Sequence, residues 1–362
     1  MLLFLLGCGS SIINNEKPLL EDTAEDVTNI EESSPEEEEQ DTQEQQDDTN
    51  DTPEDTDIVE PSEEEQEEEE EQEEEQEEEE EEEEDTSSSE TTLADLTDFS
   101  IDGPYAVYET TGMADVTGCM GMNYKIYTPN IESGFLMILG HGFGRGGSSM
   151  TDWGNHFASW GFTVLLPTDL CHYNILSGVD PELNAINLIE LADVHGGESR
   201  IYTGHSAGGL SSLIATTMDS NAIGLIGLDT TDTGAYPGPP PQMGLDFAPS
   251  VAVPAFSLIG EPSSCNTENN SIPLFDLVSG SSTVRISGAD HCDYEGPTDW
   301  ACESLCLNST TSVFPDSEIR PTIRQLATAA AMWISGLNDD GELYWSEDIL
   351  MEMGSTGLVQ PL

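Results

Sequence analysis

The segment from Arg200 to Gly209 places a serine where nucleophilic chemistry needs one. It reads Arg-Ile-Tyr-Thr-Gly-His-Ser-Ala-Gly-Gly and contains the pattern Gly204-x-Ser206-x-Gly208. A serine hydroxyl is a weak nucleophile until a neighbouring base takes its proton. The pattern is typical of a sharp strand-to-helix turn that exposes the hydroxyl. We therefore interpret Ser206 as a nucleophile; the alternative is a glycine-rich turn without chemistry.

Further motifs give the chain a resemblance to the α/β-hydrolase superfamily. They are Leu139-Gly-His-Gly-Phe143, Ala158-Ser-Trp-Gly-Phe-Thr-Val164, Ile226-Gly-Leu-Asp229 and Gly288-Ala-Asp-His291. The resemblance covers about residues 120–335 and points to the chlorophyllase, polyester-hydrolase and dienelactone-hydrolase-like branches. It implies an α/β-hydrolase fold, with a mainly parallel central sheet flanked by helices. It also implies a serine hydrolase of carboxylic esters that forms an acyl-enzyme and requires no metal or cofactor.

The same resemblance selects the partners of the serine, because in that superfamily the nucleophile, the acid and the histidine follow one another along the chain. His291 is the only one of the six histidines that follows Ser206, and it is our candidate general base. Asp229 is the preferred acid, since chlorophyllase-like and platelet-activating-factor acetylhydrolase-like enzymes carry a Leu-Asp or Val-Asp pair at this strand end. Glu261, after the next predicted strand, and Asp232, which a turn would also explain, stay as alternatives.

The negative charge that develops on an attacked carbonyl oxygen needs backbone N–H donors. In such folds the residue after the nucleophile, Ala207, supplies one donor, and the loop His141-Gly-Phe-Gly144 supplies the other, which we assign to Phe143. We expect His141 to brace this loop and His205 to point away from the site. Candidate aromatic residues for contact with substrate are Trp153, Tyr236 and Trp300, and a place in the core or at the rim is the alternative for each of them.

The elements that must position these residues are predicted from strand-like apolar runs that alternate with helix-like ones, which favours parallel strands with crossover helices. Strands are predicted over residues 123–128, 135–140, 162–166, 200–203, 223–229, 255–259 and 283–287. Helices are predicted over residues 153–160, 182–194, 207–218 and 322–337. Residues 234–250 are rich in proline and glycine and are predicted to form a loop.

The composition is strongly acidic, with 74 Asp and Glu against 7 Lys and Arg and a formal net charge of −67. Nucleic-acid binding depends on clustered basic residues, so this composition argues against it. Residues 9–92 include an almost pure glutamate run and are predicted to be a disordered acidic linker. Residues 93–362 then form the catalytic domain, with a monomer as the default state.

Residues 1–8 end in Leu-Leu-Gly-Cys, which resembles a bacterial lipoprotein signal with Cys8 as the acylated residue. A basic region normally precedes such a signal, and its absence suggests that translation starts upstream. We expect export and a lipid anchor in the outer membrane or at the cell surface, with a periplasmic or secreted protein as the alternative.

Six cysteines remain after Cys8, and an even number in an exported chain favours disulfides. They allow 15 pairings, which the sequence leaves open, although at least one bridge is expected among the last four. The pattern Cys-x-x-Cys is absent, so we do not expect a zinc site.

Other functions stay open at this point. The same triad could cleave amides or thioesters, or a hydrolase scaffold could serve as a non-catalytic surface binding protein.

Overall fold

The computed structural model describes residues 91–174, 178–232, 243–306 and 314–362. All of them lie in one unit, residues 87–362. The predicted signal at residues 1–8 with Cys8, the linker up to residue 90, and Tyr236 fall outside the described residues.

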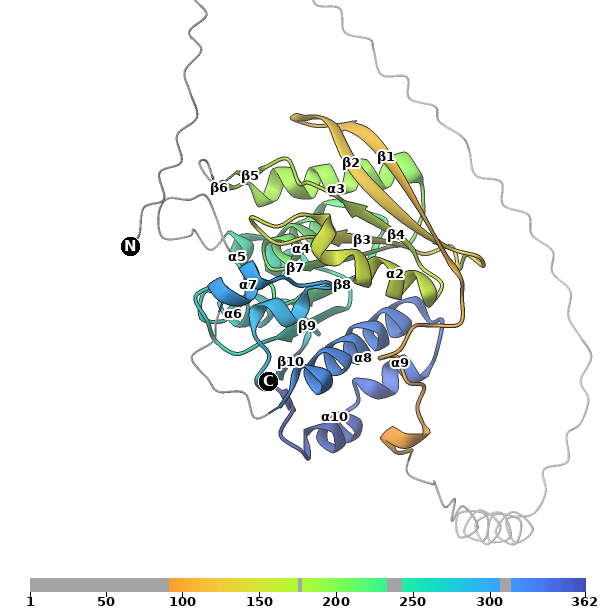
Figure 1. The fold of residues 1–362 in the computed structure, drawn as a ribbon, viewed down its shortest axis with the longest axis vertical. Helices are drawn as coiled ribbons and strands as arrows, with labels where there is room; N and C mark the ends of the chain where they lie inside the picture. The colour runs from red at the N-terminus through yellow and green to blue at the C-terminus, as the bar shows by residue number, and fades with distance from the viewer. Residues whose placement is uncertain (1–90, 175–177, 233–242, 307–313) are drawn as a thin grey trace, which may run out of the picture. The chain divides into compact units, whose positions relative to one another are not determined.

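Figure 1 shows how the strands and helices follow one another. The strands are β1 Val107–Val116, β2 Cys119–Pro129, β3 Leu136–Gly140, β4 Thr163–Pro167, β5 Tyr173–Asn174, β6 Gly178–Val179, β7 Arg200–His205, β8 Ala222–Leu228, β9 Ala255–Ile259, β10 Ser282–Ile286 and β11 Val359–Pro361. The α-helices are α2 Thr151–Ser159, α3 Pro181–His195, α4 Ala207–Met218, α5 Gly244–Phe247, α6 Ile272–Phe275, α7 Trp300–Leu305, α8 Asp316–Ser335, α9 Asp340–Tyr344 and α10 Glu347–Gly354. Short 3-10 helices are η1 Leu93–Asp95, η2 Gly147–Met150, η3 Ala248–Ser250 and η4 His291–Tyr294.

Nine of the described strands form one sheet in the order β1-β2-β4-β3-β7-β8-β9-β10-β11. Neighbouring strands from β4 to β10 are parallel, whereas β1 and β2 at one edge and β11 at the other join antiparallel. Strands covered on both faces read as continuous apolar runs, and every residue of β3, β7 and β9 is buried. The structure therefore confirms an α/β class with a mainly parallel sheet flanked by helices.

Helices cover both faces of this sheet because successive strand residues point to opposite sides. Ile138 packs in the core that contains Leu188 of α3 and Leu213 of α4. Its neighbour Leu139 packs in the other core, with Phe157 of α2 and Leu326 of α8. Among the described residues, no helix combines the length and apolar character that crossing a membrane requires.

The loop predicted over residues 234–250 is wrong at its C-terminal end, where α5 and η3 form. Gly244 is buried there, and its N–H donates to Oδ1 of Asp232 at 3.0 Å. Burial of this turn thus stabilises helical structure in a segment whose proline and glycine content favours a loop.

The parallel strands bring the candidate residues to one edge of the sheet. His141 follows β3, Ser206 follows β7, Asp229 follows β8 and His291 comes shortly after β10. The carboxyl ends of parallel strands meet at a common edge, which is where open α/β sheets place their sites.

Candidate active site

Ser206 sits at the sharp turn between β7 and α4 in a backbone conformation that L-residues seldom adopt. Its φ is 56° and its ψ is −124°. Its N–H donates to the carbonyl of Leu228 at 3.1 Å, and its own carbonyl accepts from the N–H of Thr231 at 3.1 Å. Strained backbone of this kind persists only where the surroundings hold it in place. Here the last residue of β8 and the segment after it supply those bonds.

Glycines around the turn are required for space. A Cβ on Gly204 would lie 2.5 Å from the carbonyl carbon of Gly208, and a Cβ on Gly208 would lie 2.5 Å from that of Gly140. These separations are far below van der Waals contact. The pattern Gly204-x-Ser206-x-Gly208 therefore lets β3, β7 and the start of α4 approach closely.

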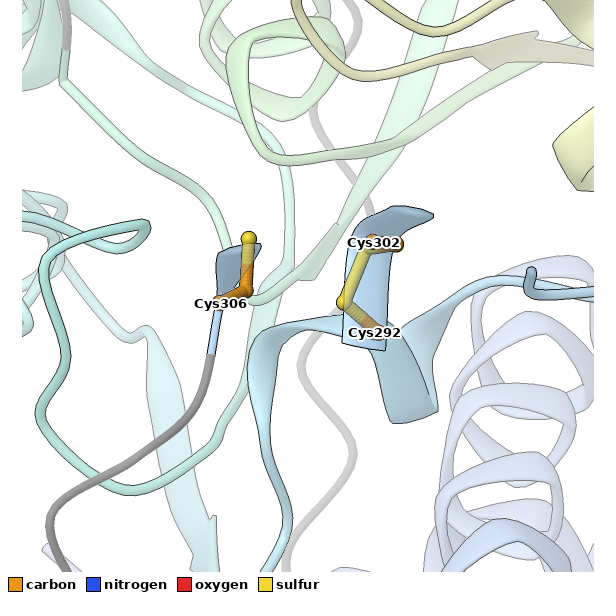
Figure 2. A group of neighbouring side chains, drawn as sticks. All are labelled: Cys292, Cys302 and Cys306. Atoms are coloured by element: carbon orange, nitrogen blue, oxygen red, sulfur yellow. A yellow bond between two sulfur atoms is a disulfide. The ribbon is translucent and has the colours of Figure 1, made fainter. Parts of the chain in front are cut away.

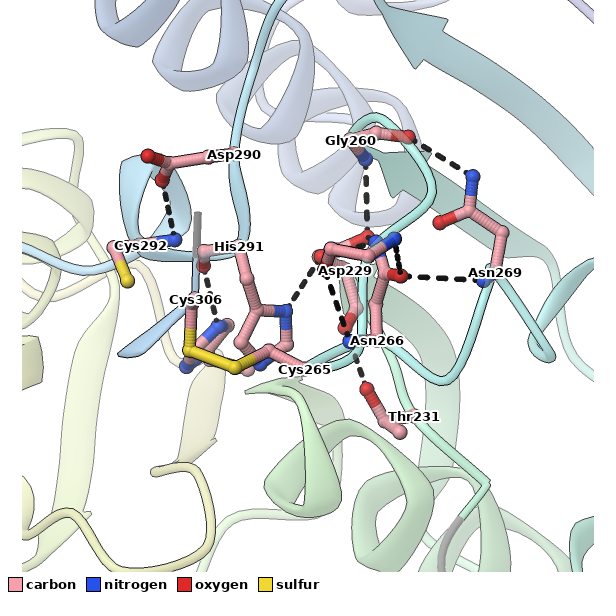
Figure 3. Close-up of polar contacts among 12 residues, drawn as sticks. Asp229, Thr231, Gly260, Cys265, Asn266, Asn269, Asp290, His291, Cys292 and Cys306 are labelled. Carbon is pink, nitrogen blue, oxygen red and sulfur yellow. Dashed lines mark hydrogen bonds and ion pairs between the residues drawn. A yellow bond between two sulfur atoms is a disulfide. The ribbon is translucent and has the colours of Figure 1, made fainter. Parts of the chain in front are cut away.

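His291 and Asp229 form a buried hydrogen-bonded pair (Figure 3). The imidazole Nδ1 lies 2.6 Å from Oδ2 of Asp229. His291 is 5% exposed and Asp229 is fully buried. A carboxylate only accepts, so Nδ1 carries the proton and donates it. In the neutral ring Nε2 then has a free lone pair, as a general base requires.

Further donors hold Asp229 in place. Its Oδ1 accepts the N–H of Gly260 at 3.0 Å, and the amide nitrogen of Asn266 lies 3.2 Å from Oδ2 (Figure 3). The same amide donates to the carbonyl of Glu261 at 2.8 Å. Asn266 was not predicted from the sequence. It lies 37 positions from Asp229, and no local motif marks it.

The two alternative acids lie elsewhere. Oε1 of Glu261 accepts the N–H of Gly288 at 2.9 Å, which braces the loop before His291. Oδ1 of Asp232 accepts the N–H of Gly244, and burial raises the pKa of Asp232. Of the three candidates, Asp229 is the one whose described hydrogen bonds include the imidazole of His291.

The loop after β3 passes directly beside the serine. A Cβ on Gly142 would lie 3.3 Å from Cβ of Ser206, so the main chain leading to Phe143 runs past the side chain of Ser206. Ala207 is the first residue of α4, and the first N–H groups of a helix lack acceptors within the helix. Both predicted donors are thus on segments that border Ser206.

His141 ties this loop to the rest of the sheet edge. Its Nδ1 donates to the carbonyl of Gly142 at 3.0 Å, and its Nε2 accepts the N–H of Leu170 at 3.0 Å. Burial lowers the pKa of His141 to about 4, so the ring is neutral at pH 7 and can make both bonds. This geometry agrees with the expected bracing role.

A pocket of about 530 Å³ opens at Ser206 and His291. It is lined by Gly142, Phe143, Gly144, Arg145, His205, Ser206, Ser264, Cys265, Thr267, His291, Glu295, Ala301, Cys302 and Cys306. Phe143 is 37% exposed and Trp300, next to Ala301, is 79% exposed. Trp153 is buried, with its indole N–H donating to the carbonyl of Tyr294, so it belongs to the core and not to the rim.

Disulfides build one wall of this pocket. Cys292 pairs with Cys302 and Cys265 pairs with Cys306, which bears out the expected bridge among the last four cysteines. Cys119, the first residue of β2, pairs with Cys171. Figure 2 shows Cys292, Cys302 and Cys306 close together. Each of these three sulfurs already belongs to a disulfide, that of Cys306 with Cys265. Metal binding needs free thiolates, so the cluster is better explained as part of the disulfide wall.

The expectation that His205 points away from the site is wrong. His205 lines the pocket, and its ring centroid lies 4.4 Å from that of His291. Its Nε2 donates to the main-chain carbonyl of His291 at 2.9 Å. Sequence reasoning also missed Arg145 and Glu295, a partly buried ion pair at the pocket, because the two residues are 150 positions apart.

Comparison with known proteins adds no relative: no family model matches the chain, and no curated protein matches it.

Proposed function

We propose that residues 93–362 form an α/β-hydrolase catalytic domain that cleaves carboxylic esters. Ser206 is the nucleophile, His291 the general base and Asp229 the acid. One observation carries the proposal: a strained serine at a strand-to-helix turn shares a pocket with a histidine whose Nδ1 is bound, at 2.6 Å, to a buried carboxylate. This constellation is recognised by geometry and roles on many folds.

The proposed reaction proceeds through an acyl-enzyme. Nε2 of His291 takes the hydroxyl proton of Ser206 as Oγ attacks the ester carbonyl carbon. The N–H groups of Phe143 and Ala207 bind the oxyanion. The alcohol leaves with the proton from His291. Water then gives a proton to His291 and attacks the acyl carbon. The bond between the acyl carbon and Oγ breaks, the acid leaves, and His291 returns the proton to Oγ of Ser206.

Asp229 supports these steps without changing its own protonation. It keeps the Nδ1–H tautomer of His291 and stabilises the imidazolium that forms twice per turnover. The reaction as written needs no metal or cofactor. Disulfides are typical of exported proteins, which supports export. The proposed lipid anchor at Cys8 rests on the Leu-Leu-Gly-Cys pattern. In this proposal the acidic linker spaces a monomeric domain from the membrane.

The test is hydrolysis of p-nitrophenyl esters of increasing chain length by the full chain, with Ser206→Ala beside it. Ser212→Ala is the matched control, because Ser212 is a buried serine on α4 that donates to the carbonyl of Thr203. We expect activity in the wild type and in Ser212→Ala, and its loss in Ser206→Ala. Preference for paired amides or thioesters would revise the substrate class. A folded but inert wild type would favour the binding-protein alternative.

A further inference from the structure

Glu295 is a carboxylate in an unusual place, buried at the pocket beside the proposed base. Its side chain has no exposed surface. Arg145 holds it with two parallel hydrogen bonds, Nε to Oε1 at 2.7 Å and Nη2 to Oε2 at 2.8 Å. Such two-point pairing fixes both side chains in one orientation. The proposed mechanism does not use this pair.

The Arg145–Glu295 ion pair joins two of the segments that carry the proposed chemistry, and His205 lies close to it from a third segment. Arg145 belongs to the loop after β3 that contains Phe143, and Glu295 follows η4, which begins at His291. His205, at the end of β7, lies beside Glu295 and His291: its Nδ1 is 3.8 Å from Oε1 of Glu295, and its Nε2 donates to the carbonyl of His291.

The charges of this cluster are set by burial and by the ion pair. Burial raises the pKa of Glu295, and the guanidinium of Arg145 opposes that rise. Burial holds the pKa of His205 well below its usual range, so His205 is neutral and donates from Nε2. A protonated His291 lowers the pKa of Glu295. The carboxylate of Glu295 and an imidazolium at His291 therefore attract each other.

Other titratable groups also face this region, and their charges act on the two histidines together with that of Glu295. Asp229 bonds to His291 directly, and His141 and Arg145 act on His205. Asp229 stabilises the proton of His291 from the Nδ1 side. Glu295 acts from the side of the ring on which His205 packs.

We propose that Glu295, paired with Arg145, is a positioning residue that stabilises the protonated form of His291, and that His205 fixes the backbone of His291 for this purpose. The inference rests on the proposed hydrolase function. Its physical basis is a fixed negative charge in a water-poor site, where charges act more strongly than in water.

Glu295→Gln tests the charge at nearly constant shape. Without the carboxylate, the imidazolium is less stable, so His291 loses its proton more easily. We expect the acidic limb of the kcat/KM profile to move to lower pH by roughly half a unit. We also expect kcat to fall by about three- to tenfold, with KM little changed, because the imidazolium forms only after binding. Glu295→Asp keeps the charge and should return the limb to the wild-type position.

Asp219→Asn is the matched control, because Asp219 is also a buried carboxylate in an ion pair. It bonds to Arg200 at 2.9 Å and to the hydroxyl of Tyr202 at 2.6 Å. Arg200 begins β7, whereas Ser206 follows its last residue. This variant should lower the melting temperature without moving the acidic limb.

His205 is tested by substitutions that keep or remove its donor. His205→Leu should lower kcat by about tenfold with KM little changed. His205→Gln can present an amide N–H to the carbonyl of His291 and should recover most of that loss.

These outcomes distinguish a failure of the roles of Glu295 and His205 from a failure of the proposed hydrolase function. If the wild type hydrolyses esters but the acidic limb of Glu295→Gln stays in place or moves to higher pH, the role of Glu295 is overturned. Equal losses in His205→Leu and His205→Gln would overturn the role of His205, and this comparison also holds if Glu295→Gln does not fold. A wild type without Ser206-dependent activity would instead remove the proposed function.

Discussion

Replacing Asp229 by asparagine should disable the base while leaving its shape in place. The N–H of Gly260 donates to Oδ1, so the new amide oxygen is expected to stay there. The amide NH2 then takes the position of Oδ2, which is 2.6 Å from Nδ1 of His291. Two donors cannot bond to each other, so Nδ1 becomes the acceptor and the ring proton moves to Nε2. In that tautomer Nε2 can no longer take the proton of Ser206.

The substitution also removes the negative charge of Asp229, which lowers kcat in addition to the change of tautomer. A carboxylate about 4 Å from the imidazolium charge contributes about 4 kcal/mol at an effective dielectric constant of 20. The donors on Asp229 already offset part of this, so we expect kcat to fall by about 10³-fold, with KM within about threefold of the wild type. The new amide also faces the amide nitrogen of Asn266, so the free energy of unfolding should fall by about 1–3 kcal/mol.

The assay is kcat and KM on p-nitrophenyl acetate at pH 8, with urea unfolding to confirm the fold. Glu261→Gln and Asp232→Asn are the matched controls, because each removes a candidate acid whose described bonds do not reach His291. Both should keep kcat within about tenfold of the wild type. The reasoning is refuted if Asp229→Asn keeps a tenth of the activity, or if either control loses as much as Asp229→Asn does.

Three further perturbations test the surroundings of the site. Gly142→Ala places a Cβ 3.3 Å from Cβ of Ser206, so we expect kcat to fall by about tenfold while the melting temperature changes little; an unchanged kcat would contradict the placement of this loop. Reducing the three disulfides should lower the free energy of unfolding by about 2–4 kcal/mol each, measured by urea unfolding with and without dithiothreitol; equal stability in both would argue against these bridges. Burial lowers the folded pKa of His141 to about 4, so its neutral form contributes stability above pH 6.5 that is lost as pH falls towards 4. His141→Gln should therefore flatten the stability–pH curve in that window by about 3 kcal/mol, and an unaltered slope would refute a neutral buried ring.

The sequence predicts the parts of the fold in which local pattern and burial agree. The strands that became β3 and β9 are short, mostly apolar runs, and β3, β7 and β9 are buried at every residue. The predicted helix 207–218 has the bounds of α4, because the glycine-rich turn fixes where it begins.

The outermost strands of the sheet, β1 and β11, were not predicted, because each depends on pairing with its neighbour, whereas the predicted strand 123–128 lies within β2. β1 is largely exposed and lacks an apolar alternation, but its residues pair along β2 from Val107 to Val116. β11 has three residues and depends on antiparallel pairing with β10. The short helices α9 and α10 were also missed, and they close the core near the C-terminus, where Tyr344 and Ile349 are buried.

At the site, motifs identify the residues that lie at strand ends but not the contacts between distant loops. Ser206 and His291 carry local signals, and the structure brings both to one pocket. The choice between Asp229 and Glu261 needed three-dimensional geometry, since each follows a strand. Arg145 and Glu295 have no local signal at all, and only the fold places them together.

The most direct test of the central claim is covalent labelling with a fluorophosphonate, read by intact mass and peptide mapping. Such a probe bonds to an activated serine and retains the adduct. We predict one adduct per chain on Ser206, none in Ser206→Ala, and much slower labelling in His291→Ala. A folded wild type that stays unlabelled, or an adduct on another residue that persists in Ser206→Ala, would contradict the assignment of Ser206 as the nucleophile.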